Sequence, residues 1–342
     1  MHDVEALHRS AINALASGNH DLAAVLAGRA VALDRRVANH HNTLGTALAG
    51  LGRLEEAAAS YRRATRLAPD EPGLWCNLGL ILCRLGRNRE AVGVFRRALA
   101  LDPTSARSPA QSGLAQALYP GDDYRAVLSA IHETLRPATY VEIGVSTGAS
   151  LALVRAPTVA IGIDPAPRLS GELPASIRIV PLTSDRFFAE HDLRAAFGGR
   201  GFDLAFVDGL HTFEQTLTDI ANLERQADPD SVILVHDVLP ADEACAARDC
   251  RSALWAGDTW KIVPVLRRIR PDLTLFLIPT APTGLAVIRG LTPARAGDLT
   301  AALKRSMTEV MALTFADFVA LEGERRGLMI ANEGRAIEEY LR

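Results

Sequence analysis

Histidine and aspartate side chains that could move a proton follow two apolar runs in the second half of this sequence. The first run leads into Asp208 and His211, and a later one leads into His236 and Asp237. Imidazole titrates near neutral pH, so His211 or His236 could act as a general base. These four side chains are the candidate catalytic residues. In the plainer alternative, His236 pairs with Asp208 or Asp237 only to close the strand ends.

A glycine turn follows an apolar run further upstream. Glu142, Gly144, Ser146 and Gly148 fit the pattern E-x-G-x-x-x-G, and Ser146 departs from the G-x-G-x-x-G form of dinucleotide sites. Glycines at a strand-to-helix turn allow close backbone approach and leave N–H groups facing a ligand. Asp164 ends the next apolar run, where a carboxylate can accept both hydroxyls of a ribose.

Together these features resemble the class I S-adenosylmethionine-dependent methyltransferases. In that family the glycine turn holds the amino-acid part of the cofactor, and the acid after the second strand binds its ribose. The resemblance implies S-adenosylmethionine as cofactor, held by Gly144, Gly148 and Asp164, with Glu142 and Ser146 in the same turn. Alternatively, Glu142 is a structural carboxylate that pairs with nearby backbone or an arginine.

Ser184 and Asp185 follow the third apolar run. In the family this region approaches the adenine, which makes both residues candidates for cofactor binding. The same two residues would also open a helix well, as a cap and a first-turn acid. The sequence leaves both interpretations open.

The segments D-G-L-H (208–211) and H-D (236–237) resemble a subgroup of small-molecule and saccharide-type methyltransferases. In related metal-dependent O-methyltransferases the corresponding strand ends hold a divalent cation, which implies Asp208, His236 and Asp237 as ligands here. His236 stands where an acid is usual, and imidazole shifts preference from magnesium towards transition metals. Without a metal, His211 or His236 would take the proton of a hydroxyl acceptor.

The segment from Trp255 to Lys261 contains two aromatic residues, Trp255 before Asp258 and Trp260 after it. The aromatics could stack on an acceptor such as a sugar. Alternatively, Asp258 caps a helix and Trp260 lies in the core.

From Tyr140 onward, apolar runs alternate with helix-like stretches such as 184–197 and 212–227. This alternation predicts a doubly wound α/β fold of the Rossmann-like methyltransferase type, with a mostly parallel sheet. The connection between the last two runs is short enough for a hairpin, so one edge strand should be antiparallel. The seven predicted strands are residues 139–144, 158–164, 177–182, 202–208, 231–237, 273–279 and 283–290.

The first third of the chain has a period of 34 residues. His41, Leu44, Gly45, Leu48, Ala57, Tyr61, Ala64 and Pro69 recur as Trp75, Leu78, Gly79, Leu82, Ala91, Phe95, Ala98 and Pro103. The pattern resembles the tetratricopeptide repeat, one helix-turn-helix per period, and predicts an α-solenoid that binds a protein partner. Three repeats are expected, over 4–37, 38–71 and 72–105.

These patterns divide the chain into four parts. Residues 1–105 are the predicted repeats, 106–121 a linker, 122–291 the methyltransferase domain and 292–342 C-terminal helices. A helix over 122–135 is expected to precede the first strand. Two helices are expected near 293–305 and 307–341, and the sequence suggests no role for them.

Composition excludes several classes of protein. The net charge of −3 argues against a general nucleic-acid surface. No apolar run reaches the roughly 18 residues of a membrane span, and the N-terminus lacks the pattern of a secretory signal. Four cysteines without zinc-site spacing suit a cytoplasmic protein with reduced thiols.

The sequence therefore predicts methyl transfer to an oxygen, with nitrogen as second choice, on a small-molecule or glycan acceptor. One alternative is a non-enzymatic adaptor whose sheet domain is a relic of a cofactor-binding domain. Another is different chemistry on the same fold, because a fold does not fix a function.

Overall fold

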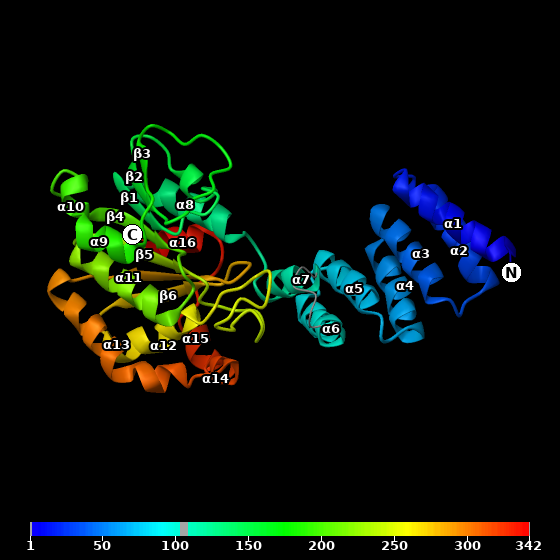
Figure 1. The fold of residues 1–342 in the computed structure, drawn as a ribbon. Coiled ribbons are helices and arrows are strands. Elements are labelled where there is room, and N and C mark those ends of the chain that lie inside the picture. The colour runs from blue at the N-terminus through cyan, green and yellow to red at the C-terminus, as the bar shows by residue number, and fades with distance from the viewer. Residues whose placement is uncertain (1, 103–108, 342) are drawn as a thin grey trace. The chain divides into compact units, whose positions relative to one another are not determined.

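The computed structural model describes residues 2–102 and 109–341, which divide between two compact units, Met1–Leu118 and Tyr119–Arg342 (Figure 1). Every helix in these described ranges is too short or too polar to cross a bilayer. The first unit is helical, and the second contains the sheet.

The first unit is built from paired helices, as the repeat pattern predicts. Its helices are α1 (His2–Ala16), α2 (His20–Leu33), α3 (Ala38–Gly50), α4 (Leu54–Leu67), α5 (Pro72–Arg84), α6 (Asn88–Leu101) and α7 (Pro109–Leu118). Glycine lets the two helices of a pair approach closely, because a Cβ on Gly45 would lie only 2.9 Å from the Tyr61 ring. Gly79 faces Phe95 in the same way in the next pair. The three predicted repeats therefore form a solenoid.

Helix α7 occupies part of the predicted linker, which is wrong over residues 109–118. The helix packs against α5 and α6, and Gly113 lies against the Phe95 ring, which leaves no room for a side chain. Gly113 stands one further period after Gly79, so α7 takes the place of the first helix of a fourth repeat. The end of the third predicted repeat (103–105) and the start of the predicted linker (106–108) lie outside the described residues.

The second unit is a doubly wound, Rossmann-like sheet with strand order β3-β2-β1-β4-β5-β7-β6. Strands β1 to β5 are parallel, and β7 runs antiparallel to both neighbours. The predicted hairpin is present, but its reversed strand β7 lies between β5 and β6 rather than at the edge of the sheet. Every residue of the central strand β1 is buried, so both faces of the sheet are covered. The strands are β1 (Thr139–Ile143), β2 (Val159–Ile163), β3 (Ile177–Val180), β4 (Phe202–Val207), β5 (Ala227–His236), β6 (Thr274–Ile278) and β7 (Leu285–Arg289).

Helices of this unit pack in two groups, α8 with α16 and α11 with α12 and α13. Side chains from α8, α16 and alternate strand residues share one apolar core, which includes Leu128, Phe206 and Ile337. The bounds are α8 (Tyr124–Leu135), α9 (Ser184–Glu190), α10 (Leu193–Ala196), α11 (Phe213–Arg225), α12 (Ile262–Ile269), α13 (Ala296–Met311), α14 (Phe315–Ala320), α15 (Glu322–Arg326) and α16 (Gly334–Leu341).

Two segments that were predicted as continuous helices are interrupted in the structure. The stretch 184–197 is broken between α9 and α10, where the Asp192 side chain accepts from the Arg194 N–H and starts a new helix. The C-terminal region forms four α-helices among the described residues instead of two. A Thr314–Asp317 capping box starts one of them, and the segment around Met329 pairs with edge strand β6.

Candidate active site

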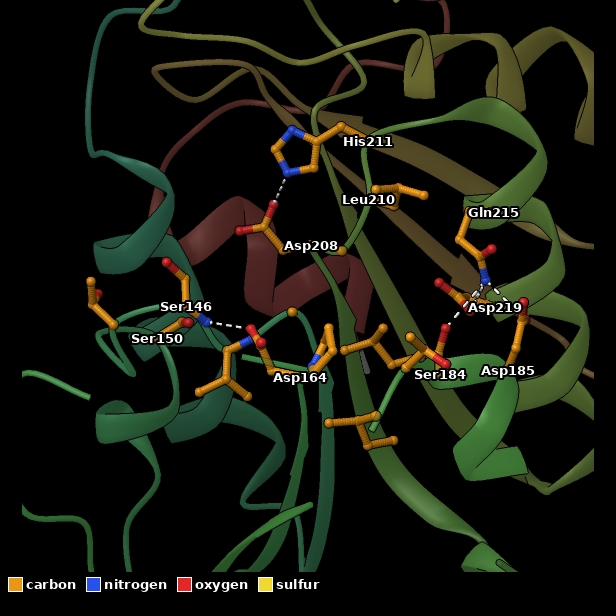
Figure 2. Close-up of a pocket in the computed structure, with 18 of the residues that line it drawn as sticks. Ser146, Ser150, Asp164, Ser184, Asp185, Asp208, Leu210, His211, Gln215 and Asp219 are labelled. Carbon is orange, nitrogen blue, oxygen red and sulfur yellow. Dashed lines mark hydrogen bonds and ion pairs between the residues drawn. The ribbon is translucent and has the colours of Figure 1, made fainter. Parts of the chain in front are cut away.

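A cavity of about 600 Å³ lies at the carboxyl ends of the parallel strands (Figure 2). This is where open α/β sheets bind ligands. The predicted residues that line it are Gly144, Ser146, Asp164, Ser184, Asp185, Asp208 and His211. Glu142, Gly148, His236 and Asp237 do not line it.

The glycine turn after β1 is held by Asp164 at the end of β2. The backbone N–H groups of Val145 and Ser146 donate to Asp164 Oδ2 at 2.9 and 2.8 Å, and the Ala166 N–H donates to Oδ1 at 2.7 Å. Gly144 has a φ of +89°, and any side chain there would overlap the Asp208 backbone. A carboxylate oxygen has further lone pairs, so Asp164 can brace the turn and still accept from a ligand.

Glu142 lies beneath the turn rather than in the cavity. The hydroxyls of Tyr140 and Ser150 each donate to its carboxylate at 2.7 Å. Burial raises the pKa of Glu142 to about 8, and the two hydroxyl hydrogen bonds oppose that rise only in part. The prediction that Glu142 contacts the cofactor is therefore not supported by its position. Its partners are hydroxyls instead of the backbone or arginine of the plainer alternative.

The four candidate catalytic residues come together at the ends of β4 and β5. His236 Nδ1 donates to Asp208 Oδ1 at 3.0 Å and lies 3.4 Å from Asp237 Oδ1. His211 Nε2 lies 3.5 Å from Asp208 Oδ1, and its Nδ1 lies 3.1 Å from Asp237 Oδ2. Adjacent parallel strands deliver their ends to one edge, so the predicted juxtaposition is present.

The carboxylates control the charge of both imidazoles. Burial lowers the pKa of His236, but Asp237 and Asp208 outweigh it and raise the pKa to about 10. Burial also lowers the pKa of His211, but the charges of Asp237 and Asp208 outweigh burial and raise this pKa to about 9. The two histidines in turn hold the pKa of Asp208 well below its usual range, against the effect of burial. At neutral pH the cluster therefore consists of carboxylates and imidazolium groups.

A loop after β5 fixes the orientation of His211. His211 Nδ1 donates to the Trp255 carbonyl at 2.9 Å, and the Trp255 ring stacks on the imidazole with centroids 5.1 Å apart. A side chain on Gly257 would collide with the His211 carbonyl. Trp260 is buried, as the plainer alternative for this segment predicts. The Nδ1 bond leaves His211 Nε2 to face Asp208.

A divalent cation would fit this cluster, but with a different imidazole from the one predicted. One ligand atom each from Asp208, His211 and Asp237 lies within 4.8 Å of the others. Asp237 Oδ2 is buried and receives no hydrogen bond from the described residues, since His211 Nδ1 donates elsewhere. His236 is engaged at both nitrogens, by Asp208 and by Thr283. A ligand set drawn from this geometry would contain His211 in place of His236.

Backbone strain is concentrated at this site. Among the described residues, four other than glycine have positive φ, and three of them are Ser146, His211 and Asp237. A left-handed conformation costs such residues roughly 1–2 kcal/mol. Strain of this kind clusters at functional sites because the surrounding structure must enforce it.

The sequence did not single out three residues that line the cavity as candidate site residues, namely Tyr124, Gln215 and Asp219. Tyr124 begins α8, and its ring packs on His236 with centroids 4.3 Å apart. Gln215 and Asp219 stand four apart on α11, and Asp219 is only 1% exposed. An acid in the interior of a helix was the available signal for Asp219.

Family comparisons match the two units separately. Residues 8–72 and 42–106 match the family described as Tetratricopeptide repeat. Residues 141–238, which include the glycine turn and the polar cluster, match the family described as Methyltransferase domain. No curated protein matches the chain.

Three solved structures similar to this chain are repeat proteins, and each of these three matches covers 34% of the chain. MamA is 22% identical with a TM-score of 0.32, over 66% of its length. The Arabidopsis OM64 TPR domain is 20% identical with a TM-score of 0.33, over 95%. The second TPR domain of human RPAP3, in complex with an HSP70 peptide, is 20% identical with a TM-score of 0.32, over 94%. The chain thus joins N-terminal tetratricopeptide repeats to a C-terminal methyltransferase domain.

Proposed function

We propose that the second unit is an S-adenosylmethionine-dependent methyltransferase that acts on a hydroxyl group of a small-molecule or saccharide-type acceptor. The observation that carries this proposal is the single cavity in which the glycine turn, Asp164 and the Asp208–His211 pair meet. Methyl transfer to a hydroxyl needs a site for the cofactor and a group that takes the hydroxyl proton. The candidate residues for both roles face the same cavity.

The order of the lining residues suits a cofactor laid along the strand ends. In Figure 2 the turn at Ser146, the Asp164 carboxylate and the Ser184–Asp185 pair follow one another across the cavity. The amino-acid part would lie at the turn, the ribose at Asp164 and the adenine near Ser184. This order would leave the reacting methyl beside Asp208.

S-adenosylmethionine would supply a methyl group whose bond to sulfur breaks as a new bond to the acceptor oxygen forms. The acceptor proton must leave in the same process. His211 is held with Nε2 towards Asp208, and Asp208 lines the cavity. With a pKa of about 9, His211 would be a competent base only in its neutral form, so this version works best at alkaline pH.

A cation held by Asp208, His211 and Asp237 is the second way to remove that proton. A divalent ion bound there would lower the pKa of a coordinated hydroxyl. One imidazole with two carboxylates favours a transition metal over magnesium. The buried Asp237 Oδ2, which lacks a hydrogen bond from the described residues, supports this version.

The repeats would bring the enzyme to a protein partner. A groove of about 530 Å³ lies in the first unit between α3 and α5. Asn42 and Asn77 line it, and Asn77 Nδ2 donates to Asn42 Oδ1 at 2.9 Å. The remaining amide groups can donate to and accept from an extended backbone.

Calorimetric titration of the full chain with S-adenosylhomocysteine tests the cofactor assignment. Binding in the wild type and its loss in Gly144→Val would support it, because valine would fill the turn. Unimpaired binding in that variant would refute it. Binding without turnover on any hydroxylated acceptor, with or without a divalent ion, would favour the adaptor.

A further inference from the structure

Helix α2 lies in the first helix pair of the solenoid (Figure 1), and its exposed face is apolar. Val25 and Leu33 are 60% and 61% exposed, and Leu22 is 47% exposed. Residues three or four positions apart share one side of a helix, so a single surface, the α2 face, is formed by Asp21, Leu22, Val25, Arg29 and Leu33. Terminal repeats of solenoids need a polar outer face for solubility. An apolar face at this position therefore calls for a partner that covers it.

The later repeats have charged residues where the α2 face is apolar. Glu56 and Glu90 stand one and two periods after Leu22. Both are exposed, and they pair with Arg53 and Arg87 at 2.6 and 2.5 Å. Ion pairs of this kind are typical of a helix surface that faces water. The repeat fold therefore does not require an apolar residue at this position, and Leu22 needs another explanation.

A symmetric charge pattern on the α2 face indicates what covers it. Asp21 and Arg29 lie four residues before and after Val25, and both are exposed. Neither forms an ion pair within residues 2–102 and 109–341. If two copies of α2 pack antiparallel with Val25 against Val25, Asp21 of each copy lies opposite Arg29 of the other. Rows of residues four apart interdigitate in the commonest class of helix packing. A parallel pair would instead place Asp21 against Asp21.

We propose that a second copy of this chain covers the α2 face, with the two α2 helices antiparallel across a twofold axis. Burial of Leu22, Val25 and Leu33 would drive the association. The two pairs between Asp21 and Arg29 would set its direction, because complementary charges fix register more than they add affinity. The dimer is isologous, since the same face serves both copies.

Gly28 supports the close approach of a second helix. Its counterparts one and two periods later are Arg62 and Arg96. A Cβ at Gly28 would meet no neighbouring atom within 4 Å, so packing within the first unit does not require glycine there. A second backbone on this side of α2 would exclude a long side chain. The groove between α3 and α5 contains no residue of α2, so pairing leaves it open to a protein partner.

Sedimentation equilibrium of the full chain tests the proposal without any ligand. We expect a dimer whose fraction rises with protein concentration. Val25→Arg should weaken dimerisation at least about tenfold, because it brings two cations together at the twofold axis. A wild-type chain that is still monomeric at about 100 μM would overturn the proposal. A dimer that Val25→Arg leaves unchanged would also overturn it, because the interface would then lie elsewhere.

Charge reversal tests the antiparallel direction. Asp21→Arg and Arg29→Asp should each weaken the dimer, because each brings like charges together. The double variant restores opposite charges in both pairs and should recover the wild-type dissociation constant. Arg63→Asp is the matched control, since it makes the same change of charge one period after Arg29, on exposed α4 surface, and should leave the dimer intact.

Two outcomes of the charge reversal would contradict the proposal. A double variant that stays as weak as the single variants would refute the antiparallel pairing. An equal loss in Arg63→Asp would show that net charge, and not the α2 face, controls the association. All the substituted side chains are at the surface, and circular dichroism shows that each variant is folded.

Discussion

Two clusters of buried charged side chains lie at opposite ends of the parallel strands. They differ in how completely their carboxylates are paired with cations and hydrogen-bond donors. Near the amino ends of the parallel strands, Arg270 is fully buried and donates to Glu224 at 2.7 Å and to Asp272 at 2.9 Å. The second oxygen of Glu224 accepts from the Thr292 N–H at 3.0 Å. Each carboxylate of this cluster has a cation, and no strained residue takes part.

The cluster at the carboxyl ends is different. Asp208 and Asp237 share two imidazoles, Asp237 Oδ2 lacks a hydrogen bond from the described residues, and both His211 and Asp237 have positive φ. Burial of charge is common to both clusters, so burial alone does not mark a site. Incomplete pairing, backbone strain and an adjoining cavity together distinguish the proposed catalytic cluster from the Arg270 cluster.

Arg270→Met should have the largest effect on stability. It leaves Glu224 buried without its cation, which typically costs about 3–5 kcal/mol. Urea denaturation followed by circular dichroism measures the loss. Adding Glu224→Gln should restore much of it, and the folded fraction should bind S-adenosylhomocysteine normally. If Arg270→Met changed ligand affinity instead of stability, the distinction between the two clusters would fail.

Asp164→Ala should weaken S-adenosylhomocysteine binding without a comparable loss of global stability. Hydrogen bonds to a charged group contribute about 1.5–3 kcal/mol each, or roughly 10- to 150-fold in affinity. Calorimetry measures the dissociation constant. Asp249→Asn is the control, because Asp249 is exposed and does not line the cavity. Similar losses in the two variants would contradict a special role for Asp164.

Asp208→Asn should abolish binding of Mn²⁺ if the carboxyl-end cluster holds a cation. Titration with Mn²⁺ alone measures this without an acceptor, and Asp185→Asn should bind the ion as the wild type does. If the wild type binds no Mn²⁺, His211 is the remaining base. Activity should then survive chelators and rise as the pH approaches 9, because only neutral imidazole accepts a proton.

Glu142→Gln should remove a pH dependence of stability. Below the ordinary pKa of 4.5 the carboxyl is protonated in both the folded and unfolded states, and up to about 8 it ionises only on unfolding. The wild-type free energy of unfolding should therefore fall as pH rises through this window, by at most about 1.4 kcal/mol per pH unit. Denaturation at pH 5 and pH 8 measures the difference. An equal fall in Glu142→Gln would show that other groups cause it.

Ser146→Gly should have the smallest effect. Glycine relieves a left-handed strain of roughly 1–2 kcal/mol but adds entropy to the unfolded chain, so the net gain should be at most about 1 kcal/mol. Thermal denaturation measures it. Destabilisation would mean that the Ser146 side chain supports the turn, which its exposure does not suggest.

The strands were predictable because each is an apolar run bounded by polar turns. The site at their ends follows from topology, since a parallel sheet brings Asp208 and Asp237 to one edge. Contributions from helices were not predictable in this way. The direction of Tyr124 or Asp219 depends on how α8 and α11 pack, which a single sequence does not encode locally.

The errors have similar causes. Helix α7 was assigned to a linker because its polar residues hide the repeat, although Gly113 keeps the period of Gly45 and Gly79. Glu142 was assigned to the cofactor because a motif records spacing but not which side of a strand faces the cavity. Nothing in the sequence indicated that Thr283, in the connection between β6 and β7, bonds to His236 and leaves His211 as the more available imidazole.

The bracing of the glycine turn by Asp164 has a kinetic consequence. Since the Val145 and Ser146 amides are already fixed, the loop needs no ordering when a nucleoside arrives. Preorganisation moves that entropic cost from binding to folding. Capture of S-adenosylhomocysteine should therefore occur in a single exponential phase whose rate rises linearly with ligand concentration. A mobile turn would instead add a slow phase that saturates.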